Sequence, residues 1–496
     1  MRRWNSRNNG GIHGWSAGTG DHPPNRPRPC LTTDRFRPFP CLPEQPLPTT
    51  AMLPRPLLVC FFCLINLLAE PGAASTPTDP PPERWRAEQA VHFALAHSPD
   101  ARAAGERIRA AEADIRVTRA AFLPQLGVSG EYGRTDNPMY SFGNILNQGL
   151  FTSDIDFNDP GITDTLQARA TLQYRVYNGG QDRAALTAAE AQAEAREHDR
   201  AAVRSRLGYE VVRAFHTIRQ AEDTVSARQS AVAAITASLE VARTRHAAGT
   251  LLREEVLNLE VQQARAEEQR IQARHGLELA RRGFSNLLGL SGGEVRLDPV
   301  GSEAQAVPDA LSAADRPELA AMAATVRAFE AEVDRAGAGH RPTTDAFASY
   351  QTETGLEHDG SGNSWLAGVR LNYTLFDGRR TDAALARATA RLAGARAEQR
   401  KLQLAVELEV EQARLALAQE EERLKVTARM VAAAAESARL ARLRFQEGVL
   451  LASDLIDTEN RLTDARISHA LATAARAMAV ADLRRAVGLT QFNEKN

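Results

Sequence analysis

The sequence carries one pattern twice, and this internal repeat limits the folds that the chain can adopt. The segment Tyr174–Gly180 reads YRVYNGG, and a similar segment, YTLFDG, begins 199 positions later at Tyr373. The same spacing of 199 positions separates Gly249 from Gly448. One spacing that holds over such a length without insertions indicates a duplicated structural unit. We therefore expect two similar halves, each made of paired strands that lead into long helices.

The change from strand to helix falls inside the repeated segment. Before it, apolar and polar residues alternate as in a strand, and after it the sequence has the period of a helix. We predict a strand-to-helix hinge in each half, formed by Tyr174, Gly179, Gly180, Tyr373 and Gly378. The first structural repeat is assigned to residues 75–300 and the second to residues 301–496.

Two long segments without proline follow the hinges, at residues 181–246 and 379–446. As uninterrupted helices they would each be about 100 Å long at 1.5 Å per residue. Apolar side chains recur with a heptad period in the second segment, at Val410, Leu417, Leu424 and Val431. This period is typical of coiled-coil packing. The glycines that follow, Gly249 and Gly448, are expected to end these helices and to mark the tips of helical hairpins.

Four shorter segments alternate between apolar and polar residues and are predicted as strands, at about 125–134, 166–177, 344–353 and 365–376. In the last of them, Trp365, Val369 and Tyr373 share the apolar face, and Arg370 lies on the other. A soluble sandwich strand would alternate as well. Aromatic residues near both ends of the apolar face, with polar residues opposite, favour a strand that faces lipid. The mainly α chain is therefore expected to have a transmembrane β part.

The connection between the first two strands is longer than its counterpart in the second half. The extra length falls within residues 135–165, which are rich in Asn, Asp and Gly. We expect a solvated loop there. The carboxylates of this stretch lack the spacing of an EF-hand, so calcium binding is not predicted.

The segment before residue 75 is expected to be separate from the fold. Residues 1–51 show no periodicity and are interpreted as disordered or as a mis-assigned upstream start, and residues 52–74 read as a secretory signal peptide. Its apolar run, at positions 56–68, is too short for a membrane anchor. A lipid anchor would need a cysteine after that run, whereas Cys60 and Cys63 lie inside it. We predict that the exported protein begins close to Ser75.

Composition and motifs exclude several function classes. The formal net charge is -2 and no basic stripe stands uncompensated, which argues against nucleic-acid binding. The sequence contains no HExxH, no phosphate-binding GxxxxGK[ST] and no GxSxG. All four cysteines lie before residue 75 and the histidines are scattered, so no metal site and no cofactor is predicted. We do not expect an enzyme.

The ordered set of motifs resembles the TolC-type outer-membrane efflux and secretion channels, the outer membrane factors. It comprises two strands, the second ending in Y-x-[VL]-[YF]-[ND]-G, a long helix, a G-x-L-x-x-x-[DE] tip and a return helix ending in LLGL or AVGL. The set occurs twice, over about residues 85–490. The residues alone already require an oligomer if the strands are in lipid, because four strands cannot close a barrel and open edges leave backbone groups unpaired.

The resemblance implies a homotrimer in which each chain gives four strands to one twelve-stranded barrel in the outer-membrane lipid of a Gram-negative bacterium. The long helices would form a tunnel across the periplasm. The implied partners are a periplasmic adaptor protein and an inner-membrane RND or ABC transporter, which would deliver drugs, metal ions or polypeptides. Two other classes stay open: a periplasmic adaptor, although no lipoyl-like half-motifs flank the helices, and a structural coiled-coil envelope protein, which would not need amphipathic strand pairs.

By the same resemblance, Asp454 and Asp457 after the second tip line a periplasmic gate, and Glu255 holds the equivalent place in the first half. Rings of carboxylates favour cations, so we expect a cation-selective entrance. The alternative is that Asp454 caps the return helix and Asp457 favours its positive end. Phe445 and Leu450 depart from the family pattern: the best-known member has Tyr and Arg at these places, and they latch the closed entrance by polar bonds.

The two tips are also predicted to dock the adaptor, because they are the points farthest from the barrel and carry leucines with no obvious core. The predicted docking residues are Gly249, Leu251, Leu252, Gly448, Leu450 and Leu451. The alternative is that these leucines pack between neighbouring helices at the tip.

Overall fold

The computed structural model of the protein describes residues 81–292, 294–298, 305–357 and 359–492. The upstream segment 1–51, the predicted signal peptide 52–74 with its two cysteines, and the expected new terminus at Ser75 lie outside the described residues.

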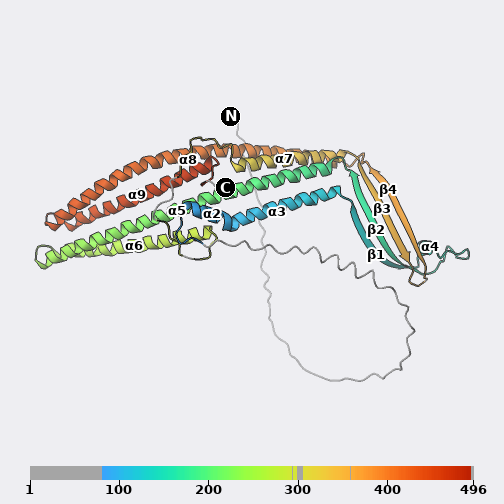
Figure 1. Ribbon diagram of the computed structural model, residues 1–496, viewed down its shortest axis with the longest axis horizontal. Coiled ribbons are helices and arrows are strands. Elements are labelled where there is room, and N and C mark those ends of the chain that lie inside the picture. The colour runs from blue at the N-terminus through green and yellow to red at the C-terminus, as the bar shows by residue number, and fades with distance from the viewer. Residues whose placement is uncertain (1–80, 293, 299–304, 358, 493–496) are drawn as a thin grey trace, which may run out of the picture. The chain divides into compact units, whose positions relative to one another are not determined.

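The two halves repeat one order of elements (Figure 1). The first half contains α2 (Ala87–His97), α3 (Pro99–Arg119), the short 3-10 helix η2 (Ala120–Phe122), β1 (Gln125–Thr135), α4 (Pro138–Asn147), β2 (Thr163–Tyr177), α5 (Gln181–Ala247) and α6 (Arg253–Leu287). The second contains α7 (Pro317–Gly337), η3 (Ala338–His340), β3 (Thr343–Thr354), β4 (Ser361–Asn372), α8 (Arg380–Gln446) and α9 (Ala452–Ala486). Every boundary of α5 and α6 recurs in α8 and α9 with the spacing of the sequence repeat.

The four strands form one antiparallel sheet in the order β1-β2-β3-β4, at one end of the helices (Figure 1). Residues that pair across neighbouring strands project from the same face. One such row is apolar in every strand and consists of Val128, Ala170, Tyr350 and Trp365. The adjacent row projects from the opposite face, is polar, and consists of Ser129, Arg169, Gln351 and Ser364. The register therefore gives the sheet one apolar face and one polar face.

Strand β4 lies earlier in the chain than the sequence pattern predicted. It was expected at 365–376, but it begins at Ser361, which pairs with Thr354 directly across a short turn. At the other end the ladder stops at Asn372, because β3 starts just after Pro342, which has no N–H to donate. The alternating residues beyond Asn372 belong to the connection that leads into α8.

The long connection between β1 and β2 contains helix α4, where a solvated loop was predicted. The Asn137 side chain accepts a hydrogen bond from a backbone amide of the first turn, and Pro138 occupies the first helical position. Both features favour a helix start. The end of α4 lies against the sheet, where a Cβ atom added at Gly362 would be 1.8 Å from the Asn147 carbonyl oxygen. Glycine at position 362 thus permits this close approach.

The hinges between sheet and long helices are tight turns with left-handed backbone. In the first half Gly179 and Gly180 have φ of +72° and +94°, and in the second Gly378 and Arg379 have φ of +68° and +65°. Glycine adopts these angles without steric cost, whereas Arg379 does not. The two tyrosines of the predicted hinge lie before these turns, at Tyr174 in β2 and at Tyr373.

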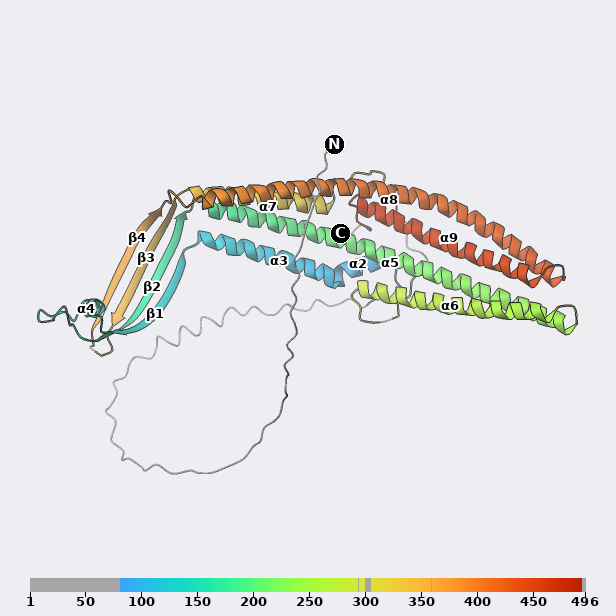
Figure 2. The ribbon, with the colours of Figure 1, turned by 180° about the vertical axis from the view of Figure 1, so that it is seen from behind.

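The helices pack as two long hairpins, α5–α6 and α8–α9, with their tips at the same end (Figure 2). Helix α5 contacts α3, α6, α7 and α9, whereas α8 contacts α7 and α9. One apolar cluster joins α2, α5 and α6 and includes Trp85, Phe215 and Phe284. A second lies at the tips, and a third joins the middle of α8 to the end of α9. Within the described ranges, no helix combines the length and apolar character that crossing a membrane requires.

Candidate functional site

The two hairpin tips have the same backbone geometry. In the first tip the amides of Gly249 and Thr250 donate to carbonyls in the last turn of α5, over 2.9 Å in both cases. In the second, Gly448 and Val449 do the same to α8, over 3.1 Å and 2.9 Å. This pair of bonds is the Schellman motif, which needs a left-handed residue. The φ angles of +75° at Gly249 and +83° at Gly448 meet that requirement.

An apolar cluster fills the space between the two tips. Its largest member is Phe445, which is 1% exposed. The other buried members are Leu239, Ala242, Val256, Leu259, Ala441, Ala452 and Leu455. Leu251 and Leu450 are half-buried against this cluster, while Leu252 and Leu451 are 71% and 60% exposed. The apolar residue at position 445 thus joins the hairpins by burial.

Polar contacts also cross from the first hairpin to the second. The Arg245 guanidinium donates to the Phe445 carbonyl over 2.8 Å and lies 5.8 Å from the centre of the Phe445 ring. The backbone amide of Ala452, the first residue of α9, donates to the Glu255 carboxylate over 2.7 Å. A carboxylate at a helix N-terminus is favourable because it binds a free amide and opposes the helix dipole. The sequence did not reveal these contacts, since they join residues about 200 positions apart.

The predicted gate residues occupy different environments. Glu255 is half-buried between the hairpins and is bonded to Ala452. Asp454 and Asp457 are both exposed, three positions apart near the start of α9. The N-cap of α9 is Leu451, so Asp454 lies at the third helical position and does not cap its own helix through its side chain. Asp454 and Asp457 thus lie on one face of α9, and Glu255 is bonded to the first residue of that helix.

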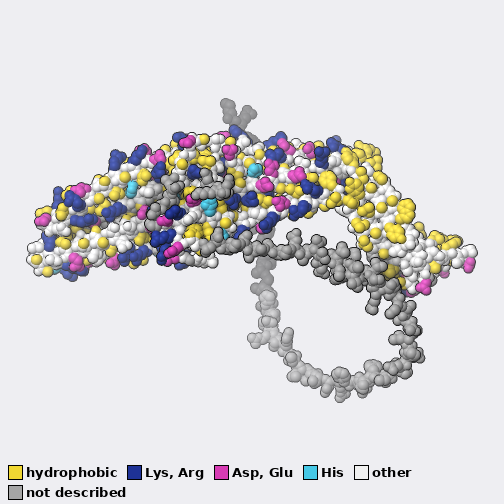
Figure 3. Space-filling view, viewed as in Figure 1, with side chains coloured by type: hydrophobic (Ala, Val, Ile, Leu, Met, Phe, Trp, Pro, Cys, Tyr) yellow, Lys and Arg dark blue, Asp and Glu magenta, His cyan; other side chains and the backbone are white. Residues whose placement is uncertain are grey.

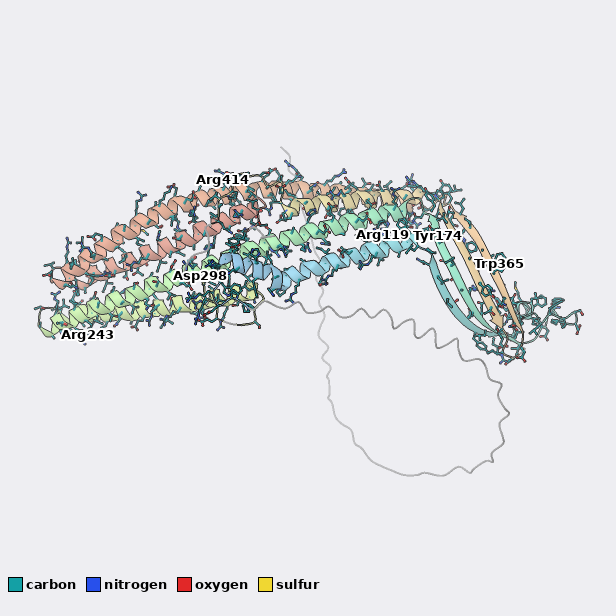
Figure 4. The ribbon with its side chains drawn as sticks, in the orientation of Figure 1. Arg119, Tyr174, Arg243, Asp298, Trp365 and Arg414 are labelled. Carbon is teal, nitrogen blue, oxygen red and sulfur yellow. The ribbon has the colours of Figure 1, made fainter. Side chains whose placement is uncertain are left out.

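The sheet forms the second notable surface. Hydrophobic side chains gather over it, whereas charged side chains cover the helices (Figure 3). Trp365, Val128 and Leu126 on the apolar face are 76%, 77% and 72% exposed. Figure 4 shows Tyr174 and Trp365 on this sheet. The opposite face carries polar contacts such as Gln167 to Glu353 over 2.8 Å. An exposed apolar face of this extent marks a surface that is covered in the functional state.

Charged networks fix the helices to one another. Glu409 on α8 binds both Arg316, at the start of α7, and Arg485 near the end of α9. Burial raises the pKa of Glu409, but the hydrogen bonds from the two arginines outweigh it and hold that pKa below its ordinary value. On α5, burial and then the neighbouring Arg219 lower the pKa of His216 to about 4. The His216 ring is therefore neutral at physiological pH.

Comparisons with known proteins agree with this architecture. A family model described as outer membrane efflux protein matches residues 90–290 and 310–489. Protein CyaE of Bordetella pertussis is 30% identical over 62% of this chain and 64% of its own length. The alkaline protease secretion protein AprF of Pseudomonas aeruginosa is 25% identical over 61% of this chain and 63% of its own length. The chain thus spans less than two thirds of the length of these relatives.

A solved structure of the outer-membrane channel OprN covers 81% of this chain and 89% of its own, with a TM-score of 0.70 and 22% identity. A sheet with one apolar face, joined to two long hairpins by tight hinges, is thus the fold that this chain shares with that channel. The chain belongs to the outer membrane efflux protein family, which confirms the resemblance inferred from the repeated motifs. Its place is the outer membrane, with the helices extending into the periplasm.

Proposed function

We propose that three copies of the chain join their sheets into one twelve-stranded barrel, which continues into a tunnel of long helices. The observation that carries the proposal is the exposed apolar face of the sheet, together with its two outer strands, β1 and β4, which pair with no further strand among the described residues. In lipid an open edge would leave backbone groups unsatisfied, so the sheet must close with other copies. The count of three follows the family resemblance.

In this proposal the channel conducts substrates that a periplasmic adaptor and an inner-membrane RND or ABC transporter deliver. Membership of the efflux family supports export as the activity, and the similarity to AprF, an alkaline protease secretion protein, supports polypeptides as one class of cargo. The protein provides a passage and carries out no catalytic step. Energy for transport comes from the inner-membrane partner.

The barrel can be tested by placing a charge on each face of β4. Val369 is 70% exposed on the apolar face, and Ser364 projects from the polar face. Arginine on a lipid-facing strand costs about 2–4 kcal/mol at the bilayer midplane, whereas the lumen tolerates it. Val369→Arg should therefore prevent assembly of heat-modifiable trimers and conductance in planar bilayers, and Ser364→Arg should leave both. Equal effects of the two changes would contradict a lipid-facing sheet.

The exposed tip residues are the proposed adaptor contacts. Leu252 and Leu451 are free to be covered by a partner, whereas Leu251 and Leu450 already pack in the tip cluster. Leu252→Ser and Leu451→Ser should weaken cross-linking to the adaptor and leave a stable trimer. Leu450→Ser should instead destabilise the tip. Unchanged cross-linking in the first two variants would remove these leucines from the docking surface.

We propose that Asp454 and Asp457 also make the entrance cation-selective. Both carboxylates are exposed near the start of α9, so three copies would place six of them around one opening. Several fixed negative charges at a constriction favour an entering cation. Replacing both by alanine should abolish the cation preference of purified channels in a planar bilayer. Unchanged selectivity with a lower melting temperature would assign them a structural role only.

A further inference from the structure

The repeat preserves contacts as well as residue types. Within the first hairpin Arg243 donates to Glu260 over 3.1 Å (Figure 4 labels Arg243), and within the second Arg442 donates to Glu459 over 2.7 Å. Each residue of the second pair lies 199 positions after its counterpart in the first. A contact in one hairpin therefore predicts the corresponding contact in the other, as long as both partners are present.

Contacts between the hairpins break this rule inside a single chain. Arg245 donates to the Phe445 carbonyl, and its counterpart, Arg444, should donate to the His246 carbonyl. The Arg444 side chain is exposed and makes no hydrogen bond or ion pair among the described residues. If a two-fold axis related the hairpins, both contacts would occur together. Only one occurs, so the hairpins are related head to tail, and such a relation continues from one copy to the next until a ring closes.

The same asymmetry affects the carboxylates at the helix starts. Glu255 accepts a hydrogen bond from the Ala452 amide at the start of α9. The counterpart of Glu255 is Asp454, and the counterpart of Ala452 is Arg253, the first residue of α6. The Asp454 carboxylate is exposed and binds none of the described residues. At the first tip, therefore, no carboxylate of the described residues binds the Arg253 amide at the start of α6. At the second tip, the Asp454 carboxylate is the counterpart of the group that would bind such an amide.

Several side chains on α6 and α8 are more exposed than their counterparts on α9 and α5, two helices that pack on each other within the chain. The Glu459 side chain on α9 is 3% exposed, but that of Glu260 on α6 is 36% exposed, although each binds the same kind of arginine. On the long helices Val426 of α8 is 52% exposed, whereas Ala227 of α5 is 6% exposed. Ile271 of α6 is 63% exposed, and its counterpart in α9 is buried. Because α5 packs on α9 within the chain, the repeat predicts that α8 packs on α6 of another copy.

We propose that Arg444 and Asp454 of one copy bind the first tip of the next copy. The Arg444 guanidinium donates to the carbonyl of His246, and the Asp454 carboxylate accepts from the amide of Arg253. The proposal rests on the oligomeric channel proposed above and identifies the partner of this surface as a second copy of the same chain. At the second tip the Arg245 guanidinium fills the space beside Gly448, where an added Cβ atom would be 2.7 Å from it. At the first tip the equivalent space beside Gly249 holds no atom within 4 Å of an added Cβ atom, so it can receive Arg444 of another copy.

The closed entrance then contains two kinds of seam in alternation: one within each chain, bonded by Arg245 and Glu255, and one between chains, bonded by Arg444 and Asp454. Accepting an N–H leaves the Asp454 carboxylate charged, so it still adds to the negative field at the opening. Its role at the seam is therefore compatible with cation selectivity. Asp457 contributes to the negative field but not to the seam.

Cysteine pairs distinguish the two seams. The sequence has no cysteine after Cys63, so an exported protein that begins near Ser75 carries only the introduced thiols. The pair Arg253→Cys and Asp454→Cys probes the seam between copies. The matched pair Glu255→Cys and Ala452→Cys probes the seam within a chain, where the structure shows the contact. After oxidation or treatment with a short bis-maleimide, the first pair should give covalent dimers and trimers on a denaturing gel. The matched pair should give internally linked monomers.

Two results would overturn the inference. One is a 253/454 variant that forms a heat-modifiable, conducting trimer but yields only monomers after cross-linking; the channel proposal then stands and this seam does not. The other is a 253/454 pair that links within one chain. If the protein without introduced cysteines forms no trimer, the channel proposal itself is contradicted, and so is the proposed seam between copies. Internally linked monomers from the matched pair show that the reagent reaches the tips.

Discussion

Replacing Phe445 by alanine tests whether apolar burial holds the two tips together. The ring is 1% exposed and packs among residues of both hairpins. The Arg245 guanidinium lies over it at 5.8 Å, and the same guanidinium donates to the Phe445 carbonyl. Removing the ring empties the centre of the tip cluster, but the backbone carbonyl and its hydrogen bond to Arg245 can remain. The change therefore isolates the apolar part of the seam.

The expected cost follows from burial. Truncation of a buried Phe to Ala typically costs about 3–5 kcal/mol, including the cavity that is left. A guanidinium over an aromatic face adds about 0.5–1 kcal/mol at a partly exposed site. We expect a loss of about 4 kcal/mol per tip pair, and since each 1.4 kcal/mol is tenfold, the closed state should become roughly 1,000-fold less favoured relative to local opening. The tips lie far from the sheet, so the barrel should remain intact (Figure 1).

Amide hydrogen exchange at Ala452 measures this opening, because that amide donates to the Glu255 carboxylate of the other hairpin. Its exchange should accelerate by up to about three orders of magnitude, and channel conductance should rise, while trimer melting is unchanged. The matched control is His246→Ala, the repeat counterpart of Phe445, which is only half-buried. Equal acceleration in both variants, or none in Phe445→Ala, would refute the reasoning.

Three further outcomes are expected. In an Arg444→Ala background, which removes the proposed contact between copies, valine at Gly448 should cost about 1 kcal/mol more than valine at Gly249. Both changes strain a left-handed turn, but only the first displaces Arg245 from its hydrogen bond; thermal unfolding of the tips compares them. The pKa of His216 is lowered from 6.5 to about 4, so the unfolded chain binds this proton first. His216 therefore does not reduce the free energy of unfolding above pH 6.5, but reduces it by about 1.4 kcal/mol per pH unit between pH 6.5 and pH 4. His216→Gln should remove this part of the pH dependence of melting. Mass spectrometry of the outer-membrane form should find a terminus close to Ser75, and a protein that retains Cys63 would contradict the signal-peptide interpretation.

Elements that depend on local signals could be predicted from the sequence. The proline-free segments and the glycines that end them defined the long helices, whose observed boundaries keep the spacing of the repeat. Alternation placed the strands, but the end of β4 depended on its pairing with β3, which stops at Pro342. Alternation alone therefore extended β4 too far. Helix α4 had a local signal, Asn137 followed by Pro138, which the abundance of Asn, Asp and Gly around it concealed.

The contacts of the candidate site were beyond sequence reasoning for a different reason. Glu255 was grouped with the two aspartates because all three are carboxylates at related positions, yet it binds the start of α9 while Asp454 is exposed. Equivalent positions in a repeat have equivalent surroundings only when every neighbour is present. In a single chain the last unit of a head-to-tail series always lacks one neighbour, and residue type cannot indicate which unit that is.

The two seams of the proposed ring also differ in chemistry, and this difference orders their opening. At the seam within a chain the second-hairpin residue is Phe445, which is fully buried under the Arg245 guanidinium. At the seam between copies the corresponding residue is His246, whose ring Nδ1 lies 2.8 Å from the Leu251 carbonyl in its own tip. A polar ring already bonded within its tip contributes less apolar burial to the seam than a phenyl ring does. Opening should therefore begin between copies, so that each chain's two hairpins move outward as one pair and the Arg245 contact is the last to break.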